Sequence, residues 1–165
     1  VAEHCLKHMD EVSEVKILDF FPSGSDERQY CSPGFDLPVG SLMRSMYGTY
    51  PEYHSSLDNI EFVSASGIAG SFKQYLRLVQ VHEINSVYLN TSPHGEPQLG
   101  RRGLYPKLGA QSNTPEGIDR MMYLLAYADG TRDLVDIANL ANRPAWDFAP
   151  EIRALRKAGL LEIQD

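Results

Sequence analysis

The apolar positions in the first part of the chain predict a short helix followed by two strands. Ala2–Met9 is expected to be a short helix or the end of a longer one. Residues 15–21 (VKILDFF) form a mostly apolar run that ends at Pro22. Because strands buried on both faces lose their polar alternation, this run predicts a strand in the middle of an α/β sheet. Residues 37–46 are the second strand candidate.

A stripe of apolar residues then recurs at helical spacing. Its members are Ile68, Phe72, Tyr75, Leu76 and Val79. This spacing predicts a helix of roughly four turns. The stripe is broad, which favours a helix laid against a sheet over one on a free surface. Residues 90–111 are rich in Pro, Gly and polar residues, and we interpret them as a long ordered connection.

The pattern changes at Thr114, after which three helices and a strand are expected. Thr114 is predicted to cap the first helix and Thr131 the second. Asp147 is predicted to cap the third, which has Pro150 in its first turn, ends at Gly159 and precedes a strand over residues 160–163. This order resembles a winged-helix module. The predicted domains are residues 1–112, an α/β unit, and residues 113–165, the winged helix.

Composition and charge narrow the function classes. The 165 residues are 42% hydrophobic and 22% charged, which is ordinary globular composition. A net charge of −7 disfavours binding to phosphate backbones or anionic lipid. Cys5 and Cys31 form neither a disulfide framework nor a zinc knuckle, so a cytoplasmic location is expected. No apolar run approaches the roughly 20 residues that span a bilayer, and no membrane association is expected.

Polar side chains follow both predicted strands. Residues 24–35 come directly after the first, and residues 50–59, which include His54 and Asp58, come after the second. Ligand sites of α/β sheets lie at such strand ends. Asp58 is four residues from His54 and could brace the loop that holds the imidazole. Taken without further information, a single loop histidine is more often structural than a metal ligand.

Several segments resemble a known family. Residues 53–59 (YHSSLDN) resemble the His-Thr-x-x-Asp segment that ends the metal site of zinc aminopeptidases and glutaminyl-cyclase-like enzymes, and residues 25–27 (SDE) resemble the Ser-Asp-His segment before it. Longer segments are similar to bacterial polysaccharide-biosynthesis proteins that have an aminopeptidase-like domain and end in a winged helix. Those segments are residues 24–34, 37–44 and 95–105.

The resemblance implies a fold, a reaction and roles for particular residues. The chain would be the C-terminal part of a zinc-aminopeptidase-like mixed sheet with flanking helices, followed by the winged helix. His54 would be a zinc ligand in a site that acts on peptide or amide bonds. Asp26 would lie near the substrate amine or relay a proton. Glu27 stands where the wider superfamily has His, and we assign it as a carboxylate supporting the site.

One histidine does not hold a catalytic zinc ion, which takes about three protein ligands and a water. The remaining ligands and the general base would lie upstream of Val1, so this chain by itself is expected to be inactive. Its expected partners are therefore the N-terminal portion of the domain and a peptide-like or amide substrate, with a homo-oligomer left open. The alternative function is a non-catalytic binding or regulatory protein whose winged helix contacts protein or DNA.

Three other groups of residues have candidate roles. Arg101 and Arg102 could grip an anion or substrate, or could pin their loop to neighbouring carbonyls and acids. His4 and His8 could share a metal, but a solvated helix end is the preferred interpretation. For the winged helix, residues 114–165 contain six basic and nine acidic residues, a net charge of −3. Arg153, Arg156 and Lys157 cluster on the third helix, yet Asp147 and Glu151 share it, which disfavours nucleic acid.

Overall fold

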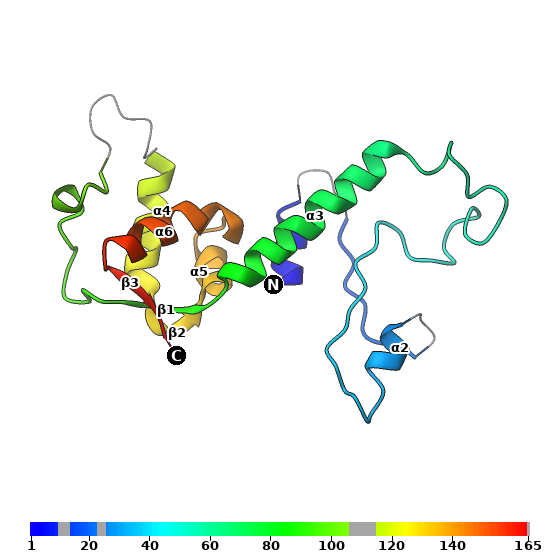
Figure 1. Ribbon diagram of the computed structural model, residues 1–165, viewed down its shortest axis with the longest axis horizontal. Coiled ribbons are helices and arrows are strands. Elements are labelled where there is room, and N and C mark those ends of the chain that lie inside the picture. Colours follow the sequence, from blue (N-terminus) through cyan, green and yellow to red (C-terminus); the bar gives the residue numbers. More distant parts are fainter. Residues whose placement is uncertain (10–13, 23–25, 106–114, 165) are drawn as a thin grey trace. The chain divides into compact units, whose positions relative to one another are not determined.

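The computed structural model describes residues 1–9, 14–22, 26–105 and 115–164, and it divides into two compact units. One consists of residues 1–12 and 74–165, and the other of residues 13–73. The first unit contains most of the regular structure (Figure 1). Its elements are α1 (Ala2–Lys7), the end of α3 (Ala65–Ile84), β1 (Val87–Asn90), η1 (Gly100–Arg102), α4 (Pro115–Tyr127), β2 (Asp129–Asp133), α5 (Leu134–Leu140), η2 (Ala145–Phe148), α6 (Ala149–Lys157) and β3 (Leu161–Ile163).

A three-stranded antiparallel sheet has the order β2-β1-β3. Tyr88 lies opposite Ile163, and Val87 lies opposite Asp133. Figure 1 shows α4, α5 and α6 grouped beside these strands. The succession of α4, β2, α5, α6 and β3 is that of a winged helix-turn-helix. The central strand β1 comes from the chain before α4, so the sheet of this module draws on residues far earlier in the sequence than its helices.

A single hydrophobic core joins the elements of the first unit. Tyr88 of β1, Leu124 of α4, Ile137 of α5 and Leu155 of α6 are fully or almost fully buried in it. Cys5 of α1 belongs to the same cluster. The helices contribute apolar faces at helical spacing, as the sequence predicted, and burial of these faces is the main force holding the module together.

Two of the predicted helix caps are wrong. The cap of α5 is Asp133, whose side chain accepts a hydrogen bond from the backbone N–H of Asp136. Thr131 lies in β2 instead, where it bonds to Asp129. Asp147 lies inside η2, and the N-cap position of α6 is Phe148. The strand β2 precedes α5 and the 3₁₀ turn η2 precedes α6, so both helices begin later in the sequence than predicted. Thr114, the predicted cap of α4, lies outside the described residues.

The second unit lacks the two predicted strands. Residues 14–21 and 37–43 have no regular secondary structure, and Ile17, Leu18 and Phe20 are 61%, 60% and 56% exposed. A strand needs a neighbouring strand to satisfy its N–H and C=O groups, and none pairs with these segments within the described residues. Before α3, the regular structure here is the single turn α2 (Glu27–Tyr30).

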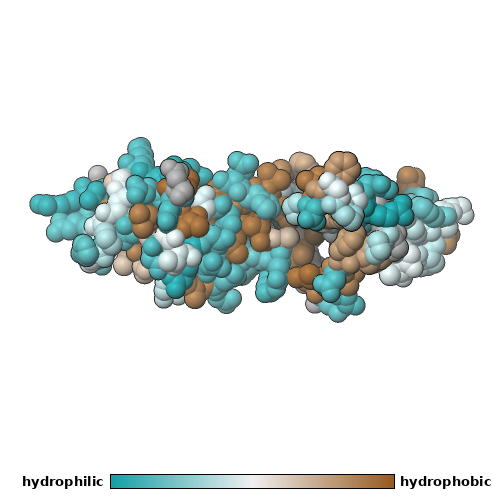
Figure 2. Space-filling view, turned by 90° about the horizontal axis from the view of Figure 1, so that it is seen from below, coloured by the Kyte–Doolittle hydropathy of each residue, from teal (hydrophilic) through white to brown (hydrophobic). Residues whose placement is uncertain are grey.

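The long helix α3 is confirmed, but its predicted packing is not. Ser64 precedes it and its hydroxyl accepts a hydrogen bond from the N–H of Gly67. Its apolar stripe is exposed, with Ile68 and Phe72 at 62% and 64%. The stripe was expected to lie on a sheet, and within residues 13–73 the described part of the chain provides no strand for it to cover. Hydrophobic side chains are visible at the surface in Figure 2.

The division of the chain at residues 112 and 113 stays a prediction, because residues 106–114 are outside the described ranges. Within the part of the chain that the structure describes, no helix combines the length and the apolar character needed to cross a membrane.

Candidate functional site

His54 lies in a tight turn of the second unit. Its φ is 54°, in the left-handed region that side chains other than Gly seldom adopt. The residue is exposed. Holding a residue other than Gly in this region costs on the order of 1–3 kcal/mol, and such positions are found preferentially at functional sites. Asp36 and Asn142 share this geometry, with φ of 48° and 51°, so the strain agrees with a functional role of His54 without being unique to it.

Ser55 provides the hydrogen bonds that hold this turn. Its hydroxyl oxygen lies 3.0 Å from the carbonyl oxygen of Glu52 and 3.1 Å from that of Pro51, and it accepts a bond from the N–H of Leu57. The N–H of Asp58 donates to the carbonyl of Ser55. The role predicted for the Asp58 carboxylate in bracing His54 stays a prediction. Ser55 was missed in the sequence, although Ser directly after a turn residue is a known signal for such bonds.

Aromatic rings surround the imidazole of His54 on one side. The ring of Tyr53 stacks on it, with centroids 4.1 Å apart and an angle of 13° between the planes. The ring centroids of Tyr47 and Tyr50 each lie 5.9 Å from that of Tyr53. Phe62 stacks on Tyr50, with ring centroids 5.7 Å apart. This cluster limits the orientations of the imidazole. These tyrosines therefore pack against one another and against the imidazole.

Asp26 and Glu27 open the single turn of α2. Asp26 occupies its N-cap position without a side-chain cap bond, and its carbonyl accepts from the N–H groups of Gln29 and Tyr30. Both residues are outside the core, so their carboxylates are available to other groups. Over the described ranges, no cluster of three or more His, Cys, Asp or Glu is arranged to hold a metal ion. The roles of Asp26, Glu27 and His54 as one site stay a prediction.

Arg101 and Arg102 form most of the short turn η1, which ends at Gly103 with a φ of 68°. The Nη1 atom of Arg102 donates to the carbonyl of Ala158 at the end of α6, at 3.2 Å. This bond matches the interpretation of Arg102 as a residue that pins its loop. Binding of an anion by Arg101 and Arg102 stays a prediction.

His4 is neither a metal ligand nor part of a solvated helix end. It is 3% exposed, and its Nε2 atom accepts a hydrogen bond from the N–H of Ala145 at 2.9 Å. The Nδ1 atom must then carry the proton, which it donates to Oδ1 of Asn139 at 2.7 Å. Both nitrogens are used, so none is left for a metal. Because α1 packs on the winged helix, the preferred solvated interpretation was wrong for His4.

The amino-acid sequence of this chain matches a known protein family. Residues 1–85 match the model of a family described as "Domain of unknown function (DUF4910)". The chain belongs to this family. Residues 86–163 match the model of the winged helix-turn-helix. The DUF4910 chain is 47% identical over 138 residues to a protein of Clostridium acetobutylicum named "Putative polysaccharide biosynthesis protein with aminopeptidase-like domain". That alignment covers 84% of this chain and 31% of the relative.

A solved structure agrees with this relationship. The crystal structure named as that of a "putative peptidase" from Clostridium acetobutylicum matches with a TM-score of 0.81 and 39% identity. The match covers 99% of this chain and 35% of that one. The resemblance to aminopeptidase-like proteins that end in a winged helix is therefore confirmed. The chain spans about a third of the length of these relatives.

Proposed function

We propose that this chain forms one wall of a zinc-dependent, aminopeptidase-like hydrolase that acts on peptide or amide bonds. In this proposal His54 is a zinc ligand, and Asp26 and Glu27 stand around the substrate. The mixed sheet of the aminopeptidase-like domain would be completed by chain beyond the residues present here. Without it, this stretch is expected to be inactive.

The left-handed turn at His54 is the observation that carries the proposal. A strained residue other than Gly is retained where the surroundings hold it in place for a purpose. Here the Ser55 hydroxyl fixes the backbone, and Tyr53 stacks on the ring. A metal ligand needs this kind of fixed orientation, because zinc accepts ligands only in a narrow geometry.

The residues of this chain fit a zinc site to which the chain contributes one protein ligand. The His54 imidazole is a good zinc donor, whereas a catalytic site takes about three protein ligands, and the described residues do not supply the others. Bound zinc would lower the pKa of its water to about 7 and so provide a nucleophile at neutral pH. The carboxylates of Asp26 and Glu27 are acceptors able to hold a substrate amine.

The exposed apolar surface of the second unit also supports the proposal. None of the described residues between 14 and 63 is buried. A segment without buried side chains has no hydrophobic core to stabilise it, so other chain must cover its apolar surface. The relatives are about three times as long as this chain, and their additional residues are the proposed cover for this surface.

Zinc content is the direct test, in a protein that carries this chain within the full length of its relatives. We expect one zinc ion per chain by elemental analysis, and its loss in His54→Ala. The matched control is His94→Ala, which removes another exposed loop histidine. Full zinc retention in His54→Ala, or equal loss in both variants, would show that His54 is not a ligand.

A further inference from the structure

The charged residues of α6 are divided between its two faces. Glu151 points inward, is 5% exposed and pairs with Arg120 of α4 at 2.8 Å. Arg153, Arg156 and Lys157 are exposed. The outer face of α6 is therefore basic, although the module as a whole carries net negative charge. Asp147 and Glu151 were both counted against a basic face; Glu151 is buried, and Asp147 lies in η2 before α6 begins.

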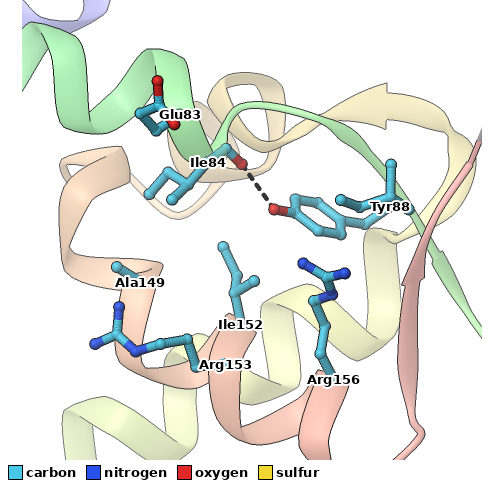
Figure 3. A pocket seen from close by; sticks show the side chains of 8 residues that line it. Glu83, Ile84, Tyr88, Ala149, Ile152, Arg153 and Arg156 are labelled. Atoms are coloured by element: carbon cyan, nitrogen blue, oxygen red, sulfur yellow. Dashed lines mark hydrogen bonds between the residues drawn. The ribbon is translucent and has the colours of Figure 1, made fainter.

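Arg153 and Arg156 line a groove, with a volume of about 390 Å³, in the first unit. Figure 3 shows both arginines rising from α6, with Glu83 of α3 on the opposite wall. The apolar surface between them includes Ile84, Tyr88 and Ile152. The Tyr88 hydroxyl donates to the carbonyl of Ile84 at 2.7 Å. The phenol is thus engaged, and the groove combines an apolar floor with two cations.

The two groove arginines differ from the other arginines of the winged helix. Arg120, Arg132 and Arg143 form ion pairs with Glu151, Asp129 and Asp119, respectively. Within the described residues, Arg153 and Arg156 form no ion pair and no hydrogen bond. Two guanidinium groups three residues apart on one helix face can share a carboxylate. Their charge is therefore available for a ligand.

We propose that this groove binds an extended acidic peptide segment of a partner protein. A carboxylate of the segment binds between Arg153 and Arg156, and an apolar side chain two residues away, which lies on the same face of an extended segment, covers Ile152 and the ring of Tyr88. The segment is extended because β3, which contributes Ile163 to the groove, is an edge strand of the sheet. Edge strands bind peptides by adding a strand.

The groove suits a peptide better than a nucleic acid. A recognition helix must present a free basic face to enter a DNA groove. Here Ile84 and Ile163 flank the arginines with apolar surface. An acidic peptide with apolar neighbours satisfies both the cations and that surface. This proposal is independent of zinc binding by His54.

Fluorescence anisotropy on the full chain tests the groove with defined probes. The acidic probe is the labelled hexapeptide Glu-Ser-Leu-Ser-Glu-Ser, which places Glu and Leu on one face when extended, and the control probes are the Leu/Lys peptide Lys-Ser-Leu-Ser-Lys-Ser and a labelled DNA duplex. We expect the acidic peptide to bind, the Leu/Lys peptide not to bind, and the duplex to bind more weakly. A charged hydrogen bond contributes about 1.5–3 kcal/mol, so Arg153→Ala and Arg156→Ala should each weaken peptide binding roughly tenfold or more.

Lys157→Ala is the matched control, because Lys157 is an exposed cation of α6 that does not line the groove. It should change the affinity less than about twofold at physiological salt. Circular dichroism shows whether each variant keeps its helices. The proposal is overturned if the acidic peptide does not bind, if Lys157→Ala has the same effect as the arginine variants, or if the duplex binds more tightly with the same arginine dependence.

Discussion

The Nδ1 atom of His4 lies 2.7 Å from Oδ1 of Asn139, and the Nε2 atom of the same ring accepts the N–H of Ala145. These two bonds fasten α1 to α5 and to the start of η2. Protonation would convert Nε2 from an acceptor into a donor facing an N–H group. These two hydrogen bonds between α1 and the winged helix therefore require the neutral imidazole.

This arrangement predicts a loss of stability at acidic pH. Burial lowers the pKa of His4; Asn139 opposes this, and nearby His8, the N-terminus and Lys7 add to the lowering. The unfolded chain, whose histidine titrates near 6.5, then takes up the proton first as the pH falls. The contribution of His4 is complete above about pH 6.5 and decreases as the pH falls toward the folded pKa.

Thermal unfolding between pH 7.5 and pH 5.0 measures this contribution. We expect His4→Gln to lower stability at pH 7.5 by about 1–3 kcal/mol and to reduce the loss on acidification. His94→Gln, an exposed loop control, should retain the pH dependence of the parent chain. An unchanged pH dependence in His4→Gln would contradict the assignment.

The ion pair of Arg120 and Glu151 predicts an asymmetric response to substitution. Their side chains are 15% and 6% exposed, and the Nε atom of Arg120 and Oε2 of Glu151 are buried without hydrogen-bond partners. Removing one partner of a buried pair costs about 3–5 kcal/mol, whereas replacing both with apolar residues is often neutral. Denaturant unfolding should show that Glu151→Met is strongly destabilised. The double variant, Arg120→Met combined with Glu151→Met, should recover most of the lost free energy of unfolding.

Asp119 and Arg143 provide the control pair for this experiment. They lie 3.5 Å apart and are 48% and 34% exposed. Exposed pairs contribute about 0–1 kcal/mol, so Asp119→Ala should change stability by no more than that. If the double variant of Arg120 and Glu151 were as unstable as Glu151→Met, the destabilisation would not come from leaving one buried charge unpaired.

Ser55 predicts an effect on zinc that acts through His54. Residues that orient a ligand typically change metal affinity by 10–100-fold when replaced. Ser55→Ala, in a protein of the relatives' length, should weaken zinc affinity in that range, as measured with a competing chelator. Ser56→Ala is the neighbouring control, since Ser56 is exposed and does not hold the turn. Equal zinc affinities of Ser55→Ala and Ser56→Ala would show that Ser55 does not orient the zinc ligand.

The helices were the part of the fold that the sequence predicted best. The apolar faces of α4 and α6 recur at helical spacing, and Gly159 ends α6 with a φ of 66°. The strand β1 was missed, because Val87–Asn90 is short and its partners lie some forty and seventy residues later. Pairing at such distances is not encoded in local periodicity.

The candidate site was predicted residue by residue, but not its supports. His54 could be found through resemblance, whereas the Ser55 bonds and the left-handed backbone depend on the folded turn. Residues 15–21 show the opposite error. Their apolar pattern predicts a buried strand, but burial requires partner strands, and the described residues of the second unit form none. Periodicity indicates which face is apolar and not what covers it.

Zinc-edge anomalous scattering from crystals of a protein of the relatives' length would test the central claim most directly. We expect an anomalous peak about 2.0–2.1 Å from a ring nitrogen of His54, with Asp26 and Glu27 at the same cavity. A peak coordinated entirely by other residues, with the His54 imidazole turned away from it, would contradict this account.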